Sequence, residues 1–469
     1  MRPSSSSSSS SSTWARLAGV AVLATATATA YYYLARRSTA GNDGVDTAVT
    51  HQTVARLLAE RYGIVHAFSS SSSSHAAGGK SKVRQRVLWR ITDLPSYDDL
   101  NFRIDVRTIF KADTKTTTTD EAYVLKFNVC GAGGDAELRL ENAAMDHLRS
   151  DPRLCDLIPC VIPARCKATT TANFNSIFRF TTATQTYHVR LLTFLRGDML
   201  ADVPLPQRTP DFMGSIGTLL GSCDAAFANG GMPQEHIRTA SSRNHFWDLR
   251  NAPNIRGWTS SVNDLDQRRL LEAAFDKFLE HGLPYLADEA SGGLRAQLVH
   301  NDANDNNIVV TRVPPFPDAN STTTTTYTVS GLIDFGDAVH TTLVNNLAIA
   351  MAYCCCVDNT SLAAGLAPQT RQAQADYARA QACALVRAYH QVMPLEEREC
   401  DALWWLMLGR VCHSLSSSAK RAEGEPGNVE YIRISEAPFW RLLDAISVES
   451  FEEHARQARE ELRRACLFS

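Results

Sequence analysis

Two stretches decide the predicted fold: Gln297-Leu-Val-His-Asn-Asp-Ala-Asn-Asp-Asn-Asn-Ile-Val-Val310 and, after a Thr-rich gap, Val329-Ser-Gly-Leu-Ile-Asp-Phe-Gly-Asp337. Each is a short apolar run that ends in small polar and carboxylate side chains. That pattern predicts a buried strand that presents acids at its end. We therefore expect the two stretches to build one active site.

The spacing of these polar residues indicates their chemistry. In His300-x-Asp302-x4-Asn307, the carboxylate of Asp302 could accept a proton from a substrate hydroxyl. Asn307 and the acid of Asp334-Phe-Gly offer the hard oxygen donors that suit Mg²⁺. Phosphoryl transfer by a kinase requires this division of labour. The alternative, a surface loop rich in Asn and Asp, is disfavoured because both motifs occur in order behind apolar strands.

Two absences bear on the acceptor. Protein kinases have an arginine in the catalytic loop where this chain has Asn301, and an Ala-Pro-Glu after Asp-Phe-Gly that this chain lacks. Both absences argue against protein substrates and favour a small-molecule acceptor. We expect His300 to brace the loop rather than to transfer protons, and Asp337 to form local hydrogen bonds.

Length and composition limit the remaining choices. The chain has 469 residues, enough for two lobes with extensions. Its net charge of −3 provides no basic surface for phosphate backbones, so we expect no nucleic-acid partner. The twelve cysteines include no Cys-x2-Cys pair, so reduced thiols are expected rather than a zinc site or a disulfide framework.

Residues 1–52 are predicted to be a leader outside the fold. A serine tract precedes Arg16, and residues 17–35 carry no charge. Two interpretations stay open: a membrane anchor, which the length of the run favours, and a Ser-rich, acid-poor transit peptide for an organelle such as the mitochondrion. A secretory signal fits a thiol-rich, nucleotide-dependent enzyme poorly. We accordingly expect the enzyme on the cytoplasmic side of a membrane or in an organelle.

Residues 53–196 are predicted to form an N-terminal, nucleotide-binding lobe, with an antiparallel sheet of about five strands and one packed helix. The apolar runs that indicate strands are 83–91, 101–110, 121–129, 160–163, 176–180 and 187–195. A helix is expected over 136–149, where apolar residues recur on one face. The serine run 69–74 is expected to be a flexible loop.

Residues 197–469 are predicted to form a mainly helical C-terminal lobe that holds the catalytic and substrate site. Helical spacing of apolar residues is found over 212–227, 265–280, 374–393, 401–416 and 437–465. The only strands expected there are the short ones around the opening motif. A sheet lobe followed by a helical lobe that carries catalytic acids predicts an α+β, bilobal fold of the protein-kinase type.

Lys126 is the candidate phosphate-binding lysine. Strand alternation places its side chain on the face opposite Leu125 and Phe127. In kinase-type sites such a lysine pairs with a glutamate on the following helix. Glu141 is the candidate for that glutamate, and Glu137 is the alternative.

The turn before Asn101 is the candidate cover for the nucleotide phosphates. No Walker A sequence occurs in the chain, and this turn lacks the Gly-x-Gly-x-x-Gly of protein kinases. We expect the backbone N–H groups of Pro95-Ser-Tyr-Asp-Asp99 to form an anion nest instead. Ser96, Tyr97 and Asn101 are therefore the candidate nucleotide contacts in this region.

From about residue 53 to its end, the chain resembles the aminoglycoside phosphotransferase family of small-molecule kinases, and within that family the hydroxylysine kinases. Beside the two opening motifs, the resemblance rests on Ser96–Phe102, Tyr123–Lys126, Arg190–Gly197 and Asn244–Asn251. It implies transfer of the γ-phosphoryl group of GTP, or of ATP, to the side-chain hydroxyl of 5-hydroxy-L-lysine with the help of Mg²⁺.

The resemblance also implies roles for particular residues: Asp302 as the base, Asn307 and Asp334 as metal ligands, and Lys126 with Glu141 as the phosphate clamp. Asn301 replaces the glycine that many relatives have, and because Asn tolerates positive φ we expect the loop to keep its shape. Two alternatives stay open: a kinase for another amino alcohol, an aminoglycoside or a sugar, and a membrane-tethered pseudokinase that binds nucleotide without turnover. The intact motif residues argue against the pseudokinase.

Overall fold

The computed structural model describes residues 49–64, 70–73, 82–94, 96, 99–112, 115–130, 135–165, 174–313, 326–424, 432–447 and 450–467. The chain divides into two compact units, the first made of Met1–Asp135 with Val161–Phe194 and the second of Ala136–Cys160 with Leu195–Ser469. The predicted lobe limits, 53–196 and 197–469, stay predictions. Two predictions fall outside the described residues: the apolar segment 17–35 and the nucleotide contact Tyr97.

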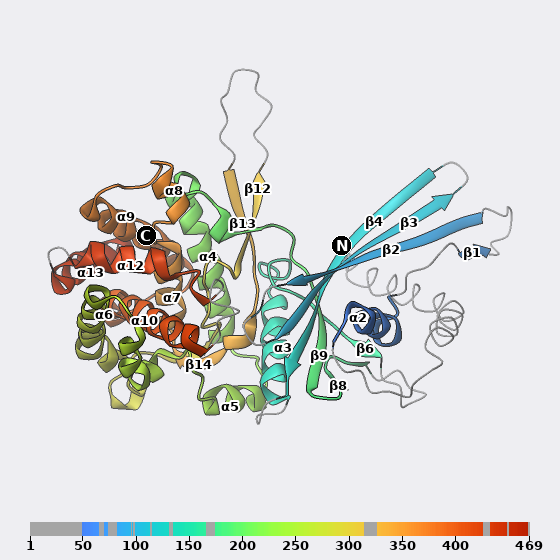
Figure 1. Cartoon of the computed structure of the whole chain (residues 1–469), viewed down its shortest axis with the longest axis horizontal. Coiled ribbons are helices and arrows are strands. Elements are labelled where there is room, and N and C mark those ends of the chain that lie inside the picture. The colour runs from blue at the N-terminus through green and yellow to red at the C-terminus, as the bar shows by residue number, and fades with distance from the viewer. Residues whose placement is uncertain are drawn as a thin grey trace, which may run out of the picture. The chain divides into compact units, whose positions relative to one another are not determined.

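The first unit is built on one antiparallel sheet (Figure 1). The strands are paired in the order β1-β2-β3-β4-β9-β5, and β8 also pairs with β9. Their bounds are β1 Ser70–Ser73, β2 Lys82–Leu94, β3 Leu100–Ala112, β4 Lys115–Val129, β5 Val161–Ile162, β8 Phe178–Thr181 and β9 Thr186–Thr193. A separate short pair joins β6 (Ala164–Arg165) to β7 (Phe174–Asn175). The predicted antiparallel sheet is confirmed.

One strand of this sheet was not predicted. The sheet has seven strands rather than about five, and the serine run expected to be a flexible loop contains β1, which pairs with β2 from Ser70↔Gln85 to Ser73↔Lys82. That expectation was therefore wrong. Backbone N–H and C=O groups at the edge of β2 can pair with any extended segment, and this pairing needs no apolar side-chain pattern that a sequence could display.

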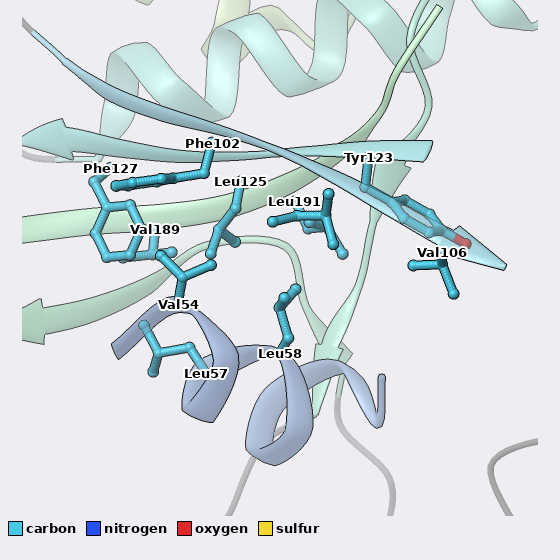
Figure 2. Packing of buried hydrophobic residues seen from close by; sticks show 11 residues of the cluster. Val54, Leu57, Leu58, Phe102, Val106, Tyr123, Leu125, Phe127, Val189 and Leu191 are labelled. Carbon is cyan, nitrogen blue, oxygen red and sulfur yellow. The ribbon is translucent and has the colours of Figure 1, made fainter. Parts of the chain in front are cut away.

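Helix α2 (His51–Leu57) packs on one face of this sheet. Figure 2 shows Val54, Leu57 and Leu58 directed toward side chains that come from the strands. The buried strand residues of this cluster alternate along β3, β4 and β9: Phe102, Ile104, Val106, Tyr123, Leu125, Phe127, Val189 and Leu191. Because successive strand residues point to opposite faces, Lys126 lies on the face opposite this core, as predicted.

The second unit is mainly helical, with two small sheets. Its helices are α3 Ala136–Arg149, α4 Pro210–Ala228, α5 Gln234–Ser242, α6 Leu265–Lys277, α7 Asn345–Cys354, α8 Asn359–Ala363, α9 Arg371–Val392, α10 Glu397–Gly424, α12 Glu436–Ile446 and α13 Phe451–Leu467. Threonine side chains cap two of the longer helices: Thr209 accepts from the N–H of Phe212 in α4, and Thr370 from that of Ala373 in α9. The predicted α+β fold class is confirmed.

One helix predicted from the sequence is divided into two helices in the structure. The sequence pattern predicts a single helix over 437–465, but the structure ends α12 at Ile446 and starts α13 at Phe451. The Ser450 hydroxyl accepts a hydrogen bond from the N–H of Glu453, 3.0 Å away. Ser450-Phe-Glu-Glu453 is a capping-box sequence, which starts a new helix even where the apolar period continues across the junction.

The strands of the second unit surround the opening motif. Strands β10 (Asp198–Met199), β12 (Ile308–Val313) and β13 (Thr326–Leu332) form one sheet, and β11 (Ala296–Val299) pairs with β14 (Val339–Thr342) in another. None of the described helices is both long enough and apolar enough to cross a bilayer.

Candidate active site

Backbone pairing joins the two halves of the opening motif. The first half leaves β11 at Val299 and returns at Ile308, while the second leaves β13 at Leu332 and re-enters a strand at Val339. Val299 is paired with Val339, and Ile308 with Leu332, so the two polar loops start and end on the same pair of small sheets. The N–H of Ile333 also donates to the carbonyl of Asn307 at 2.9 Å.

His300 braces this junction. Its Nε2 donates to the carbonyl of Ile333 at 3.0 Å, and its Nδ1 accepts from the N–H of Asp302 at 3.2 Å. These partners identify the neutral tautomer that carries its proton on Nε2. Burial lowers the pKa of His300, and its ring meets that of Phe335 edge to face at 4.6 Å. Both ring nitrogens are committed to backbone groups, which is the bracing role expected for this residue.

Three side chains hold the Asp302 carboxylate. The guanidinium of Arg410 donates to Oδ1 at 2.8 Å. The amides of Asn304 and Asn307 donate to Oδ2 at 2.9 and 2.7 Å. The Arg410 side chain is 2% exposed, whereas that of Asp302 is 21% exposed. The three donors therefore fix the position of the carboxylate, and part of the Asp302 side chain stays accessible to solvent.

The environment of Asp302 makes it a better base than an ordinary carboxylate. Burial, with the nearby charge of Asp337, raises the pKa of Asp302 to about 8, while Arg410 acts in the opposite direction. A general base works best when its pKa lies near the working pH, because it must accept a proton and yet be deprotonated beforehand. A carboxylate held in this way could abstract a proton from a substrate hydroxyl, so Asp302 stays the candidate base.

Asn307 and Asp334 present oxygen atoms suited to a divalent cation. The Nδ2 of Asn307 donates to both the carbonyl and the carboxylate of Asp302, at 2.9 and 2.7 Å, so Oδ1 is the atom of this amide that could bind a cation. Asp334 is exposed and adopts φ 61 at the end of β13. Two protein oxygens suit Mg²⁺, which usually completes its shell with water and phosphate oxygens. No group of three or more His, Cys, Asp or Glu side chains in the described residues is arranged to hold a metal.

A second segment, residues 243–250, runs along the loop that follows Asp334. Four contacts join them: Arg243 Nη1 to the Ala338 carbonyl at 2.8 Å, His245 Nε2 to Asp337 at 3.2 Å, Arg250 Nη2 to the His340 carbonyl at 2.8 Å, and Thr341 Oγ1 to Asp248 at 3.0 Å. This segment overlaps Asn244–Asn251, which is part of the family resemblance. Its structural work is to hold the Asp334–Thr342 loop in place.

Aromatic rings surround the Arg410 guanidinium. It lies over the rings of Trp247 and Tyr353, at 4.7 and 5.5 Å from their centroids. Phe246 meets the His413 ring edge to face at 4.9 Å, and Trp247 lies tilted against it at 5.0 Å. Burial, together with the charge of Arg410, holds the pKa of His413 well below its usual value. Cation–π contacts of this kind stabilise a buried arginine whose carboxylate partner is also partly buried.

The candidate nucleotide contacts lie in the first unit. Asn101 of β3, Lys126 of β4 and Arg190 of β9 are directly paired across neighbouring strands, so they form one row on the face opposite the apolar core. All but Asn101 are buried, at 7% exposure for Lys126 and 2% for Arg190. The amide of Asn128 donates to the Asp99 carboxylate beside this row. Ser96 is half-buried in the turn before β3.

Both candidates for the glutamate that would pair with Lys126 lie on α3 in the second unit, and their surroundings differ. Glu137 forms an ion pair with Arg243, whose Nη2 is 3.0 Å from its carboxylate. Glu141, one turn along α3, is 4% exposed. Because Arg243 also donates to Ala338, Glu137 serves to join α3 to the Asp334–Thr342 loop. Glu141 stays the candidate for the lysine partner.

A family model for the phosphotransferase enzyme family (APH) matches residues 110–395. The chain belongs to this family. It is a small-molecule phosphotransferase that acts on an alcohol group, and the recognition made from the sequence motifs is confirmed.

Among curated proteins, the chain is similar to hydroxylysine kinases. It is 26% identical to that of Mus musculus over 359 residues, covering 76% of this chain and 84% of the relative. It is 25% identical to that of Danio rerio over 360 residues, covering 76% and 86%. Similar solved structures include an amicoumacin kinase bound to AMP-PNP and Ca²⁺ (TM-score 0.45, 12% identity, 74% and 89% covered) and a spectinomycin phosphotransferase bound to ADP and spectinomycin (TM-score 0.47, 11% identity, 88% and 98% covered).

Sequence reasoning missed three residues of these sites. Asn304 was passed over because it stands in a run of Asn and Asp with no positional signal. Arg190 belongs to a stretch used for the resemblance but was given no role. Arg410 had a readable signal: it interrupts the apolar helical run Leu406-Met-Leu-Gly-Arg-Val-Cys412. A charge on a buried helix face must have a partner, so such an arginine points to a buried carboxylate elsewhere.

Proposed function

We propose that this enzyme transfers the γ-phosphoryl group of GTP or ATP to the side-chain hydroxyl of 5-hydroxy-L-lysine. The observation that carries the proposal is the Asp302 carboxylate, held by Arg410, Asn304 and Asn307 and accessible on its remaining side. The acceptor is taken from the curated relatives, which are hydroxylysine kinases.

In the proposed reaction each residue has one task. Asp302 orients the acceptor hydroxyl and takes up its proton as the oxygen attacks phosphorus. Lys126, with Glu141 as its partner, holds the α- and β-phosphates, and Asn101 and Ser96 contact the nucleotide. Asn307 and Asp334 would hold Mg²⁺, which when bound neutralises charge on the phosphate oxygens.

An acceptor panel tests this proposal. Purified full-length enzyme is incubated with Mg²⁺ and either GTP or ATP, and with 5-hydroxylysine, simpler amino alcohols, an aminoglycoside or an amino sugar. Mass spectrometry then identifies any phosphorylated acceptor. We expect 5-hydroxylysine to be phosphorylated with the highest kcat/KM. A higher kcat/KM for another acceptor would identify that compound, rather than 5-hydroxylysine, as the substrate. Nucleotide binding without transfer to any acceptor would favour a pseudokinase.

Replacing the base tests its role. We expect Asp302→Asn to lower kcat by about 10²- to 10⁴-fold, the usual contribution of general base catalysis. Asn is preferred to Ala because Ala would leave the buried Arg410 without a partner, a change that typically costs about 3–5 kcal/mol of stability. Asp305→Asn, in the same loop, is the matched control and should retain activity. Near-normal kcat in a folded Asp302→Asn enzyme would contradict the assignment.

A further inference from the structure

Two cysteines far apart in the sequence meet in the second unit. Cys400 lies in the first turn of α10 and Cys466 near the end of α13, and their Sγ atoms are 3.4 Å apart. The eleven cysteines in the described part of the chain are thiols rather than disulfides. A disulfide bond is about 2.05 Å long. The two sulfur atoms would therefore have to approach by only about 1.4 Å to become bonded.

Ion pairs beside the two thiols hold the helices in this register. Arg463, one turn before Cys466, donates through Nε to Oδ1 of Asp401 at 2.6 Å. Its Nη1 also lies 2.6 Å from Glu397, one turn earlier on α10. Arg463 thus bridges two carboxylates that flank Cys400 on α10. These contacts lie beside the thiols where α13 packs on α10, so they help to keep the two sulfur atoms close together.

The two thiols differ in the way that thiol–disulfide chemistry requires. Cys400 is buried at 3% exposure, whereas Cys466 is partly exposed. A hydrogen bond from the Cys400 thiol, with the charge of Arg387 also contributing, lowers the pKa of Cys466, while the same hydrogen bond and burial raise the pKa of Cys400. A thiolate is the reactive nucleophile, so Cys466 is the thiol that an oxidant would meet first.

We propose that Cys400 and Cys466 form a reversible dithiol–disulfide pair that fastens the C-terminal helix α13 to α10 when a peroxide oxidises the enzyme. The Cys466 thiolate attacks one peroxide oxygen, which gives a sulfenic acid and releases hydroxide. The Cys400 sulfur then attacks the Cys466 sulfur, forming the S–S bond and releasing water. Two electrons pass from the thiols to the peroxide, and a small dithiol reductant reverses the change. This inference does not depend on the proposed acceptor.

Peptide mapping tests the pairing. Full-length enzyme is treated with hydrogen peroxide at neutral pH, remaining thiols are alkylated, and the digest is analysed by mass spectrometry without reduction. We expect one linked peptide pair containing Cys400 and Cys466, with a mass lower by two hydrogen atoms, that separates after reduction. Cys400→Ser and Cys466→Ser should each abolish it. Cys383→Ser is the matched control, since Cys383 of α9 is another thiol whose charge interacts with Cys466, and it should leave the link intact.

Thermal unfolding tests the fastening. The oxidised wild-type enzyme should have a higher midpoint temperature of unfolding than the reduced enzyme, because the disulfide constrains the unfolded chain. The Cys466→Ser variant should show no such rise on oxidation. Full alkylation of both thiols after peroxide, or a link from Cys466 to Cys383 instead, would overturn the pairing. A Cys400–Cys466 link that leaves the midpoint unchanged would overturn the fastening of α13.

Discussion

Two residues of the catalytic loops adopt a backbone conformation that few residues tolerate. Asn301 has φ 63 and Asp334 has φ 61, and they are the described non-glycine residues with positive φ. Asn and Asp populate this region several times more often than other side chains. The expectation that Asn301 would preserve the loop in place of glycine is confirmed. Asn301 precedes the candidate base Asp302, and Asp334 is itself a candidate metal ligand, so both lie where strained backbone commonly concentrates.

Substitution at Asn301 should follow backbone preference rather than side-chain contacts. Neither polar atom of its buried amide has a hydrogen-bond partner within the described residues. Asn301→Gly should therefore lose no hydrogen bond and keep kcat near that of the wild type. Asn301→Val should lower the free energy of unfolding by about 1–2 kcal/mol, because a β-branched residue tolerates positive φ much less well than Asn does. Denaturant unfolding and kcat measurements would check both variants, and an equally stable Val variant would contradict the argument.

At the scale of elements, the close contact of α4 with α9 depends on glycine. A Cβ added at Gly217 would lie 2.0 Å from the backbone carbonyl oxygen of Leu385 in α9, a distance that no side-chain rotation relieves. The same helix offers a comparison, because a Cβ at Gly214 would lie 3.5 Å from the Ala388 Cβ and 3.9 Å from the Ala384 carbonyl oxygen, both ordinary contacts. Helix α4 matters for the site because its Asp224 carbonyl accepts a hydrogen bond from Gln297 of β11, the strand that leads into the catalytic loop.

The two glycines should respond in opposite directions to alanine. Gly217→Ala should lower the free energy of unfolding by about 1–3 kcal/mol, the range for overpacked interiors. Gly214→Ala should be neutral or should stabilise by up to about 1 kcal/mol, because alanine favours helix over glycine. Denaturant midpoints of the two variants provide the measurement. Equal effects of the two substitutions would show that the helix contact is looser than the structure indicates.

At the scale of the whole molecule, one buried acid links several helices of the second unit. The Asp224 carboxylate of α4 accepts from the Tyr389 hydroxyl of α9 at 2.8 Å and from the Asn346 amide of α7 at 3.3 Å. It is fully buried. Burial raises the pKa of Asp224 to about 7, although these hydrogen bonds oppose the shift. The folded enzyme therefore binds this proton more tightly than the unfolded chain does.

This difference predicts how stability depends on pH. Between about pH 4 and pH 7 the folded state retains a proton on Asp224 that the unfolded state releases, so the free energy of unfolding falls as the pH rises. One proton contributes at most about 1.4 kcal/mol per pH unit. Asp224→Asn should remove this contribution, so the variant should gain stability relative to the wild type as the pH rises from 4 to 7. Denaturant unfolding at several pH values checks this, and parallel curves for the two proteins would contradict it.

The sequence by itself determined much of the local structure around the motif and predicted its chemistry. Strand alternation placed Lys126 opposite Leu125 and Phe127, and the spacing of Asp302, Asn307 and Asp334 predicted the base and the metal ligands. Such patterns can be read because they arise from hydrogen bonds and side-chain periodicity among residues close in the chain. The same reasoning missed β1, which forms by backbone pairing at the edge of β2. It also predicted α12 and α13 as one helix, because the apolar period continues across the point where the Ser450 side chain caps α13.

Only the tertiary structure decided which distant residues meet. Arg410 reaches Asp302 across 108 positions, Arg295 reaches Glu399 across 104, and Cys400 meets Cys466 across 66. Periodicity does not indicate such partners, because each contact depends on how whole helices pack rather than on the residues beside it. The motif thus predicted which carboxylate is the candidate for proton transfer. The packing of α10 against the loop decided which side chains orient that carboxylate and adjust its pKa.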